Sequence, residues 1–318
     1  FSLGLSSNFW KGENMLANLA HSFILTGGWI TFRKILFVSL KITGIVFILM
    51  IIVEILEIRA KEWLEKNIVK RSFVQYLLAS VLGIIPGCSG AFLADSFYMS
   101  GVFSFGAMTA ALIATSGDEA FVMLAMASDP TVSFGIGQIA VLWGALFLLG
   151  ILFGAIGDTI VSRLGIQVCK KCEIASHPPY DTGRWIHLPH FLTKHIWEHI
   201  IKKHIWKIFL WLFGSILVIE VLGSSFNLQQ LTTDNLVLVM LLAGVVGIAP
   251  ISGPNLLFLT LFAKGTLPFS VLLVNSIVQD GHGLLPLLGF SLDDSFKLKF
   301  YNLVVGYLVG FLLLSLGL

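Results

Sequence analysis

The sequence predicts an all-α polytopic membrane protein of about ten membrane segments, built as two inverted repeats with broken helices or re-entrant hairpins. Three observations lead to this fold class. Hydrophobic residues are 56% and charged residues only 12% of the 318 residues, whereas about a quarter of an average soluble domain is charged. A short sequence ending in proline occurs twice at a wide spacing, and lysine and arginine are gathered in particular loops.

Long apolar windows supply the predicted membrane spans. A helix needs about 20 apolar residues to cross a bilayer. Six windows approach or exceed this length, at about residues 36–56, 73–95, 132–158, 206–222, 236–262 and 300–318. Other apolar pieces are too short to cross alone, because a helix rises only about 1.5 Å per residue. These pieces, predicted to be re-entrant hairpins or oblique helices, are at about 103–115, 119–128, 267–278 and 283–290.

The windows divide the chain into four parts. A surface segment at 1–34 precedes a first transmembrane repeat at 35–160, and a Cys/His-rich loop at 161–205 precedes a second transmembrane repeat at 206–318. The formal net charge is only +2, so no nucleic-acid partner is expected. The expected partners are the lipid bilayer and a small ion or anionic substrate, and a homodimer is left open.

The two halves repeat each other at a spacing of 164 residues, with Gly-Ile-Ile-Pro ending at Pro86 and Gly-Ile-Ala-Pro ending at Pro250. Proline lacks an N–H group and clashes with the preceding turn, so each helix is expected to kink or break there. Paired breaks of this kind are typical of transporter sites, although ordinary kinks with glycines for tight packing are the alternative. The residues predicted to shape the breaks are Pro86, Gly87, Ser89, Gly90, Pro250, Ser252 and Gly253.

Loop charges give the predicted orientation. Lysine and arginine are dense in 59–71 and 163–207 and absent from 224–263. Because positively charged loops stay in the cytoplasm, the first two regions are predicted to be cytoplasmic and the 224–234 linker external. That linker corresponds to 59–71, so the repeats are predicted to be inverted, with either three crossings plus a hairpin or five crossings in each half. The expected location is the bacterial cytoplasmic (inner) membrane.

In the first half, Thr-Ser-Gly-Asp-Glu at 115–119 lies between two apolar pieces. Ser116 and Glu119 have the spacing of a capping box, which would open a helix at Ala120. The functional interpretation is that the adjacent carboxylates of Asp118 and Glu119 are costly at membrane depth and therefore mark an ion path. The two interpretations are compatible, because a helix start inside a membrane can itself form a site.

The corresponding segment of the second half places His282 opposite Asp118. Inverted repeats are expected to bring these two regions together near the midplane. Carboxylates, an imidazole and amides suit a divalent ion such as Mn²⁺, and the same groups can carry protons because histidine titrates near neutral pH. The predicted substrate- or ion-binding residues are Asp118, Glu119, Asp280, His282, Asn275, Gln279, Ser116 and Asn255.

The three cysteines are too few for a disulfide scaffold. Cys88, near the first break, is interpreted as a small buried residue. In the polar loop, Cys169 and Cys172 followed by His187 and His190 supply four candidate zinc ligands, although the H-x2-H spacing is shorter than usual. The alternative is a basic amphipathic segment facing lipid headgroups. No cofactor is predicted to be required, and Zn²⁺ or another metal in the 169–199 loop is left open.

Several of these segments resemble ten-transmembrane heavy-metal exporters, a family also described as manganese transporters or arsenic efflux proteins. The runs that carry the resemblance are 114–120, 252–255, 268–273 and 275–288. The resemblance covers roughly residues 35–318, is most specific in the second half, and implies a ten-span exporter of metals. At the first break this chain has Pro86-Gly87-Cys88-Ser89-Gly90, where the family has a sequence of the type Pro-Gln-Cys-Gly.

The predicted function is a secondary active transporter that exports a divalent cation such as Mn²⁺, with proton coupling, through a midplane site between the repeats. The sequence has no P-loop, so ATP is not expected to drive transport, and no H-E-x-x-H or G-x-S-x-G motif that would indicate an enzyme. The alternative is a transporter or flippase of an anion or lipid phosphate, such as arsenite or undecaprenyl phosphate. It rests on residues 85–90, which resemble the Ile-Pro-Gly-x-Ser-Gly of undecaprenyl-phosphate translocases, and on helix ends that can bind anions. A passive channel is left open.

Overall fold

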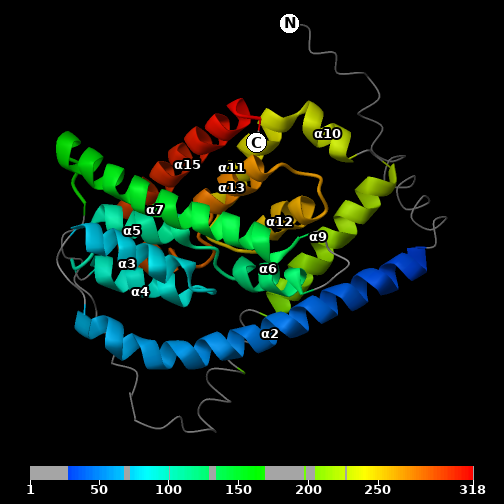
Figure 1. The fold of residues 1–318 in the computed structure, drawn as a ribbon, viewed down its shortest axis with the longest axis horizontal. Helices are drawn as coiled ribbons and strands as arrows, with labels where there is room; N and C mark the ends of the chain where they lie inside the picture. Colours follow the sequence, from blue (N-terminus) through cyan, green and yellow to red (C-terminus); the bar gives the residue numbers. More distant parts are fainter. Residues whose placement is uncertain are drawn as a thin grey trace, which may run out of the picture.

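The chain folds into a bundle of helices (Figure 1). The computed structural model describes residues 28–67, 72–99, 101–128, 134–168, 197, 205–225 and 228–317, and these ranges contain no strand. The first half has α2 (Gly28–Asn67), α3 (Ser72–Ile84), α4 (Ser89–Met99), α5 (Phe105–Ala114), α6 (Glu119–Ala127) and α7 (Ile136–Leu164). The second half has α9 (Trp206–Ser225), α10 (Leu228–Asp234), α11 (Leu236–Gly247), α12 (Asn255–Ala263), α13 (Phe269–Val278), α14 (Leu285–Phe290) and α15 (Leu292–Ser315). The predicted all-α class is confirmed.

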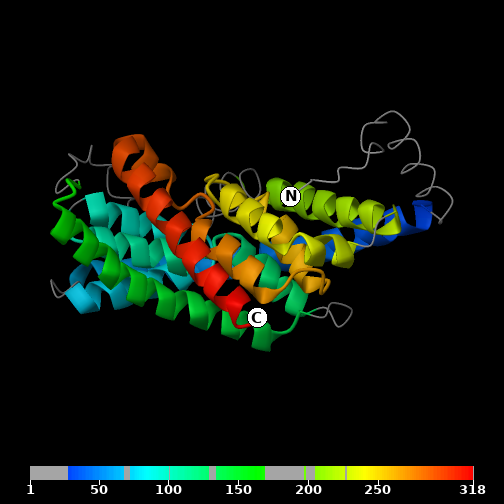
Figure 2. The same cartoon turned by 90° about the horizontal axis from the view of Figure 1, so that it is seen from above.

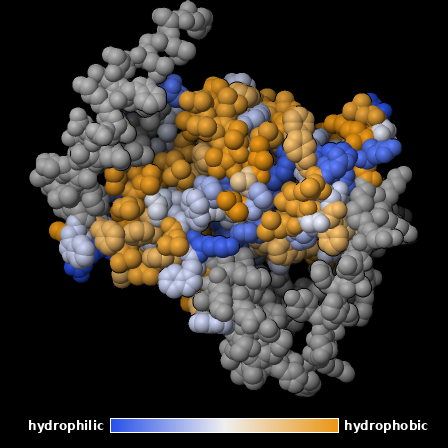
Figure 3. Space-filling model, turned by 180° about the vertical axis from the view of Figure 1, so that it is seen from behind, coloured by the Kyte–Doolittle hydropathy of each residue, from blue (hydrophilic) through white to orange (hydrophobic). Residues whose placement is uncertain are grey.

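Several stretches of the described chain are long and apolar enough to cross a membrane. They are Trp29–Ile52, Phe105–Ala127, Ile136–Leu164 and Leu292–Ser315. Large apolar side chains face outward from the last two, among them Leu148, Leu152, Phe300 and Leu308. On the face shown in Figure 3, broad hydrophobic areas flank a band of hydrophilic residues. An exterior of this kind is expected of helices that contact lipid.

Three helices of the first half have counterparts at nearly equivalent positions in the second half. Shifted by 164 residues, α3, α4 and α5 fall on α11, α12 and α13. The turns repeat as well: Gly101 and Gly265 have φ values of 73° and 72°, and Gly117 and Gly281 have values of 50° and 55°. Glycine adopts such left-handed values readily because it lacks a Cβ atom. The duplicated sequence therefore folds into a duplicated structure.

Contacts between the halves come in equivalent pairs. α7 contacts α13 while its counterpart α15 contacts α5, and α4 contacts α14 while α12 contacts α6. Within each half three helices pack together, α3, α5 and α7 in the first and α11, α13 and α15 in the second; we call these groups the first and second triplets. α15 runs obliquely across the bundle in Figure 2. α5 and α13, one from each triplet, also contact each other.

Small residues allow close packing inside the first triplet. A Cβ atom placed on Gly106 of α5 would lie 2.1 Å from the carbonyl oxygen of Gly154 in α7, so a larger side chain would force these helices apart. Asp158 of α7 also holds the start of α5, because it accepts hydrogen bonds from Gly106 N at 2.6 Å and Ser104 Oγ at 2.5 Å. The helices on which the candidate residues depend are thus firmly joined.

The observed helices differ in extent from some predicted windows. α2 runs for 40 residues from Gly28 to Asn67, beyond the predicted 36–56, because the Glu, Lys and Arg residues that follow the apolar stretch are good helix formers. The windows 73–95 and 236–262 each contain two helices separated by a break, and the short apolar pieces contain α5, α6, α13 and α14. The four-part division of the chain stays a prediction.

Candidate functional site

The two turns that carry the candidate residues lie against each other inside the bundle. One joins α5 to α6 at 115–118, and the other joins α13 to α14 at 279–284. Gln279 Nε2 donates a hydrogen bond to Thr115 O at 3.4 Å, which links two residues 164 positions apart. A Cβ atom placed on Gly117 would lie 3.7 Å from the Cα atom of Gly281. Equivalent turns of the two halves therefore meet through their backbones.

Three side chains with metal-ligand atoms converge where these turns meet. Asp118 Oδ2 lies 3.8 Å from His282 Nδ1, and Asp118 Oδ1 lies 3.8 Å from Cys88 Sγ. Cys88 comes from the α3–α4 break, which is tied to the first turn by a hydrogen bond from Gly87 N to Gly117 O at 3.0 Å. The ligand atoms of the three side chains all lie within 4.8 Å of one another. We call Cys88, Asp118 and His282 the central cluster.

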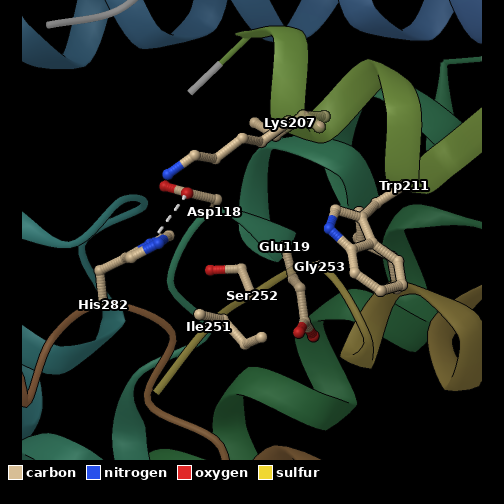
Figure 4. Close-up of a pocket in the computed structure, with 10 residues that line it drawn as sticks. Asp118, Glu119, Lys207, Trp211, Ile251, Ser252, Gly253 and His282 are labelled. Carbon is tan, nitrogen blue, oxygen red and sulfur yellow. Dashed lines mark ion pairs between the residues drawn. The ribbon is translucent and has the colours of Figure 1, made fainter. Parts of the chain in front are cut away.

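A cavity of about 240 Å³ opens beside the central cluster (Figure 4). Lys207 and Trp211 reach it from α9, and the Lys207 nitrogen points toward Asp118 in Figure 4. The other lining residues are Asp118, Glu119, Ile208, Ile251, Ser252, Gly253, Leu256 and His282. The cavity thus offers two carboxylates and an imidazole against a single lysine.

Glu119 adds a second carboxylate to the cavity wall. It is fully buried, and neither carboxylate oxygen has a hydrogen-bond partner among the described residues. The predicted capping box between Ser116 and Glu119 is wrong, because helix α6 begins at Glu119 with Asp118 as its N-cap residue. Glu119 is then the first helical residue, whereas a capping box needs a glutamate at the third. Its carboxylate therefore stays buried without a capping partner.

Asp280 lies outside the cavity and forms a buried ion pair with Lys299 of α15. Lys299 Nζ also donates to Gly247 O at 3.1 Å and Val278 O at 3.0 Å, the last carbonyls of α11 and α13. Sequence reasoning missed Lys299, because nothing in the sequence separates it from the surface residue Lys297. The only sequence signal for Lys299 is its position at the start of an apolar span, where a charged side chain usually has a partner of opposite charge.

The predicted amide ligands join helices. Asn275 Nδ2 donates to Ala243 O and to Asn255 Oδ1, both at 2.9 Å, and Asn255 Nδ2 donates to Ile251 O at 3.1 Å. Gln279 makes the bond between the turns. These three side chains are not among those that line the described cavity. Their predicted role in ion binding stays a prediction.

The predicted breaks are interruptions between helices. α3 ends at Ile84 and α4 begins at Ser89, so Pro86 and Gly87 lie in the first break, and Ser89 and Gly90 open α4. In the second half, α11 ends at Gly247 and α12 begins at Asn255, and the interruption between them contains Pro250, Ser252 and Gly253. A Cβ atom placed on Gly253 would lie 2.2 Å from Trp211 Nε1. That position therefore needs glycine to admit the indole to the cavity.

The predicted loop ligands Cys169, Cys172, His187 and His190 lie outside the described residues. Metal binding by the loop stays a prediction. Cys88, in contrast, was interpreted as a small buried residue, and the structure shows that it is buried. Its thiol also faces Asp118, which was not visible in the sequence because the two residues belong to different turns.

Comparison with known proteins points to one family. The family described as "Putative, 10TM heavy-metal exporter" matches residues 35–211 and 189–316. Comparisons with curated proteins and with solved structures found no match. The matched regions together span both triplets and every residue of the central cluster. The chain therefore belongs to the family of ten-transmembrane heavy-metal exporters, a family of membrane transporters.

Proposed function

We propose that this protein is a secondary active transporter that exports a divalent metal ion from the bacterial cytoplasm. One observation carries the proposal: Asp118 and His282 come from different halves and meet at 3.8 Å beside a cavity. A carboxylate and an imidazole both ligate divalent metals. Buried ionisable residues inside membrane helices are costly and are usually retained for function.

The proposed site lies near the membrane midplane, between two inverted repeats. The matched contacts of the triplets support a two-fold relation between the halves, and the unequal loop charges favour opposite orientations. Broken helices at corresponding positions are typical of transporters that bind their substrate between repeats. We further propose that protons drive export, because histidine titrates near neutral pH.

The alternative of an anion or lipid-phosphate transporter is less well supported. Such a substrate needs a positive site, for example an arginine or lysine cluster or an open helix N-terminus. The described cavity has one lysine, Lys207, and two carboxylates, Asp118 and Glu119. We therefore favour a cation as the substrate.

The test is ion flux in proteoliposomes that contain the full chain. Uptake of Mn²⁺, Zn²⁺ and Cd²⁺ is measured with fluorescent indicators, with and without an imposed proton gradient. Transport of arsenite and of a phosphate-bearing lipid is measured separately under the same conditions. We expect metal flux that depends on the gradient, and a loss of at least about tenfold for the double variant Asp118→Asn, His282→Ala.

The matched control is Asp293→Asn, which removes an exposed carboxylate at the start of α15. It is expected to transport like the parent. Equal flux in the parent and the double variant would show that the central cluster is not the site. Flux of arsenite or lipid without metal flux would support the alternative.

A further inference from the structure

We propose that the exported ion is bound directly by Cys88, Asp118 and His282, and that the sulfur ligand makes the protein prefer ions of the Zn²⁺ and Cd²⁺ class over Mn²⁺. This inference rests on the proposed function, since it names the substrate class of the same cavity. Carboxylates and amides alone would suit Mn²⁺, but thiolates favour softer ions. The identity of the third ligand therefore decides which metal is selected.

The spacing of the three donors suits a small tetrahedral ion. Zinc–ligand distances of about 2.0 to 2.3 Å place neighbouring tetrahedral donors about 3.3 to 3.5 Å apart. In the central cluster both separations from Asp118 are 3.8 Å, and all the ligand atoms lie within 4.8 Å of one another. We expect small side-chain rotations to bring the donors to bonding distance.

The cavity supplies the open position that an exported ion needs. Structural zinc sites are closed by four protein ligands, whereas sites that exchange a ligand keep one position open. Three donors of the central cluster leave one such position, and the cavity borders both Asp118 and His282. Water from the cavity can therefore complete the coordination while the ion remains able to leave.

The two halves differ at the position of the thiol. At the spacing of 164 residues, Cys88 corresponds to Ser252. Both side chains flank Gly281: a Cβ atom placed there would lie 2.7 Å from Ser252 Oγ and 3.8 Å from Cys88 Sγ. Equivalent positions thus present a hydroxyl and a thiol to the same turn. Only the thiol is a soft donor, so the first half carries the selectivity.

The experiment measures metal binding by the full chain in detergent. Cys169→Ser and Cys172→Ser are introduced first, which leaves Cys88 as the only thiol in the sequence. Cd²⁺ titration is followed by the ultraviolet charge-transfer band of a cadmium–thiolate bond, and Zn²⁺ and Mn²⁺ affinities are measured by competition with a chromophoric chelator. We expect the band to form, and zinc to bind more tightly than manganese.

Two variants at Cys88 separate ligation from packing. Cys88→Ala keeps a small apolar residue and Cys88→Ser keeps the shape of the thiol, so neither is expected to disturb the fold. Both are expected to lose the band and to bind Zn²⁺ and Cd²⁺ at least about tenfold more weakly, with little change for Mn²⁺. Asp118→Asn, in contrast, is expected to weaken all three ions.

Failure of this inference is distinguishable from failure of the proposed function. If Cd²⁺ binds without the band and both Cys88 variants bind like their parent, the thiol is no ligand, yet Mn²⁺ flux lost in Asp118→Asn would keep the exporter proposal. If the parent neither binds nor moves any of the three metals, both proposals fail. Each variant is checked by gel filtration, and if both aggregate, the presence or absence of the band in the parent decides.

Discussion

The side chain of Lys299 is buried inside the bundle. Its ammonium group neutralises Asp280. It also donates hydrogen bonds to two helix-terminal carbonyls, those of Gly247 and Val278. Helix ends leave carbonyl groups without intrahelical partners, and in an apolar interior such groups are costly. A single ammonium group therefore satisfies the ends of α11 and α13 and the turn that follows α13.

Removing this lysine should destabilise the fold rather than alter ion selectivity. Breaking a buried ion pair by deleting one partner costs about 3 to 5 kcal/mol, because the other charge stays buried. We expect Lys299→Met to lower the thermal unfolding midpoint in detergent markedly, and the double variant Asp280→Asn, Lys299→Met to recover part of the loss.

Lys264→Met is the matched control, since Lys264 is an exposed lysine that pairs with the exposed Glu220. It should leave the midpoint nearly unchanged. A Lys299→Met protein as stable as the Lys264→Met protein would contradict this account of the buried pair. Retained stability with lost metal binding would instead assign Lys299 to the site.

Among the connecting elements, the paired glycine turns hold the site together. Gly117 and Gly281 have the same left-handed backbone, and the two turns contact each other. Gly265 has a similar φ of 72° but no atom within 4 Å of a Cβ placed on it. Substitution at Gly265 therefore reports the cost of the left-handed backbone alone, whereas substitution at Gly117 or Gly281 also disturbs the contact between the turns.

Gly281→Ala and Gly265→Ala are predicted to differ in transport. Each places alanine in a left-handed conformation at a cost of about 1 to 2 kcal/mol, which thermal unfolding in detergent will measure. Only the Cβ at residue 281 also meets Ser252 Oγ, at 2.7 Å, and would displace the turn that carries His282. We expect metal flux in proteoliposomes to fall for Gly281→Ala and to persist for Gly265→Ala. Equal losses would show that the turn contact has no functional role.

The elements were predictable from the sequence to the extent that their signals are local. Proline and glycine mark both breaks, and the polar residues of the two turns interrupt apolar runs. The pairing of Lys299 with Asp280 and the approach of Cys88 to Asp118 depend on the fold, which no local pattern reports. The capping-box interpretation failed for a related reason, since a shift in where α6 begins changes what Glu119 can reach.

At the scale of the whole molecule, the two halves are predicted to lie in opposite orientations in the membrane. The duplicated helices and matched contacts establish the repeat. Loop charge predicts opposite orientations. Lys66 and Gln230 stand 164 residues apart in the two equivalent linkers. The membrane side on which each of them lies therefore shows whether the two halves have opposite orientations.

Lys66→Cys and Gln230→Cys are predicted to react from opposite sides of the membrane. Both are made in a chain whose native cysteines have been replaced, and intact cells are treated with a membrane-impermeant maleimide. We expect the cysteine at 230 to be labelled at once and the cysteine at 66 only after permeabilisation. Labelling of both from the same side would mean that the repeats are parallel.

The central cluster is divided between the halves, because Cys88 and Asp118 belong to the first and His282 to the second. An ion held by all three would act as a removable cross-link across the seam where the turns meet. Since the helices of each triplet pack together, we expect conformational changes to occur where the two turns meet, by movement of one half relative to the other. The loaded protein should then resist shearing of one half against the other, and release of the ion should restore that freedom.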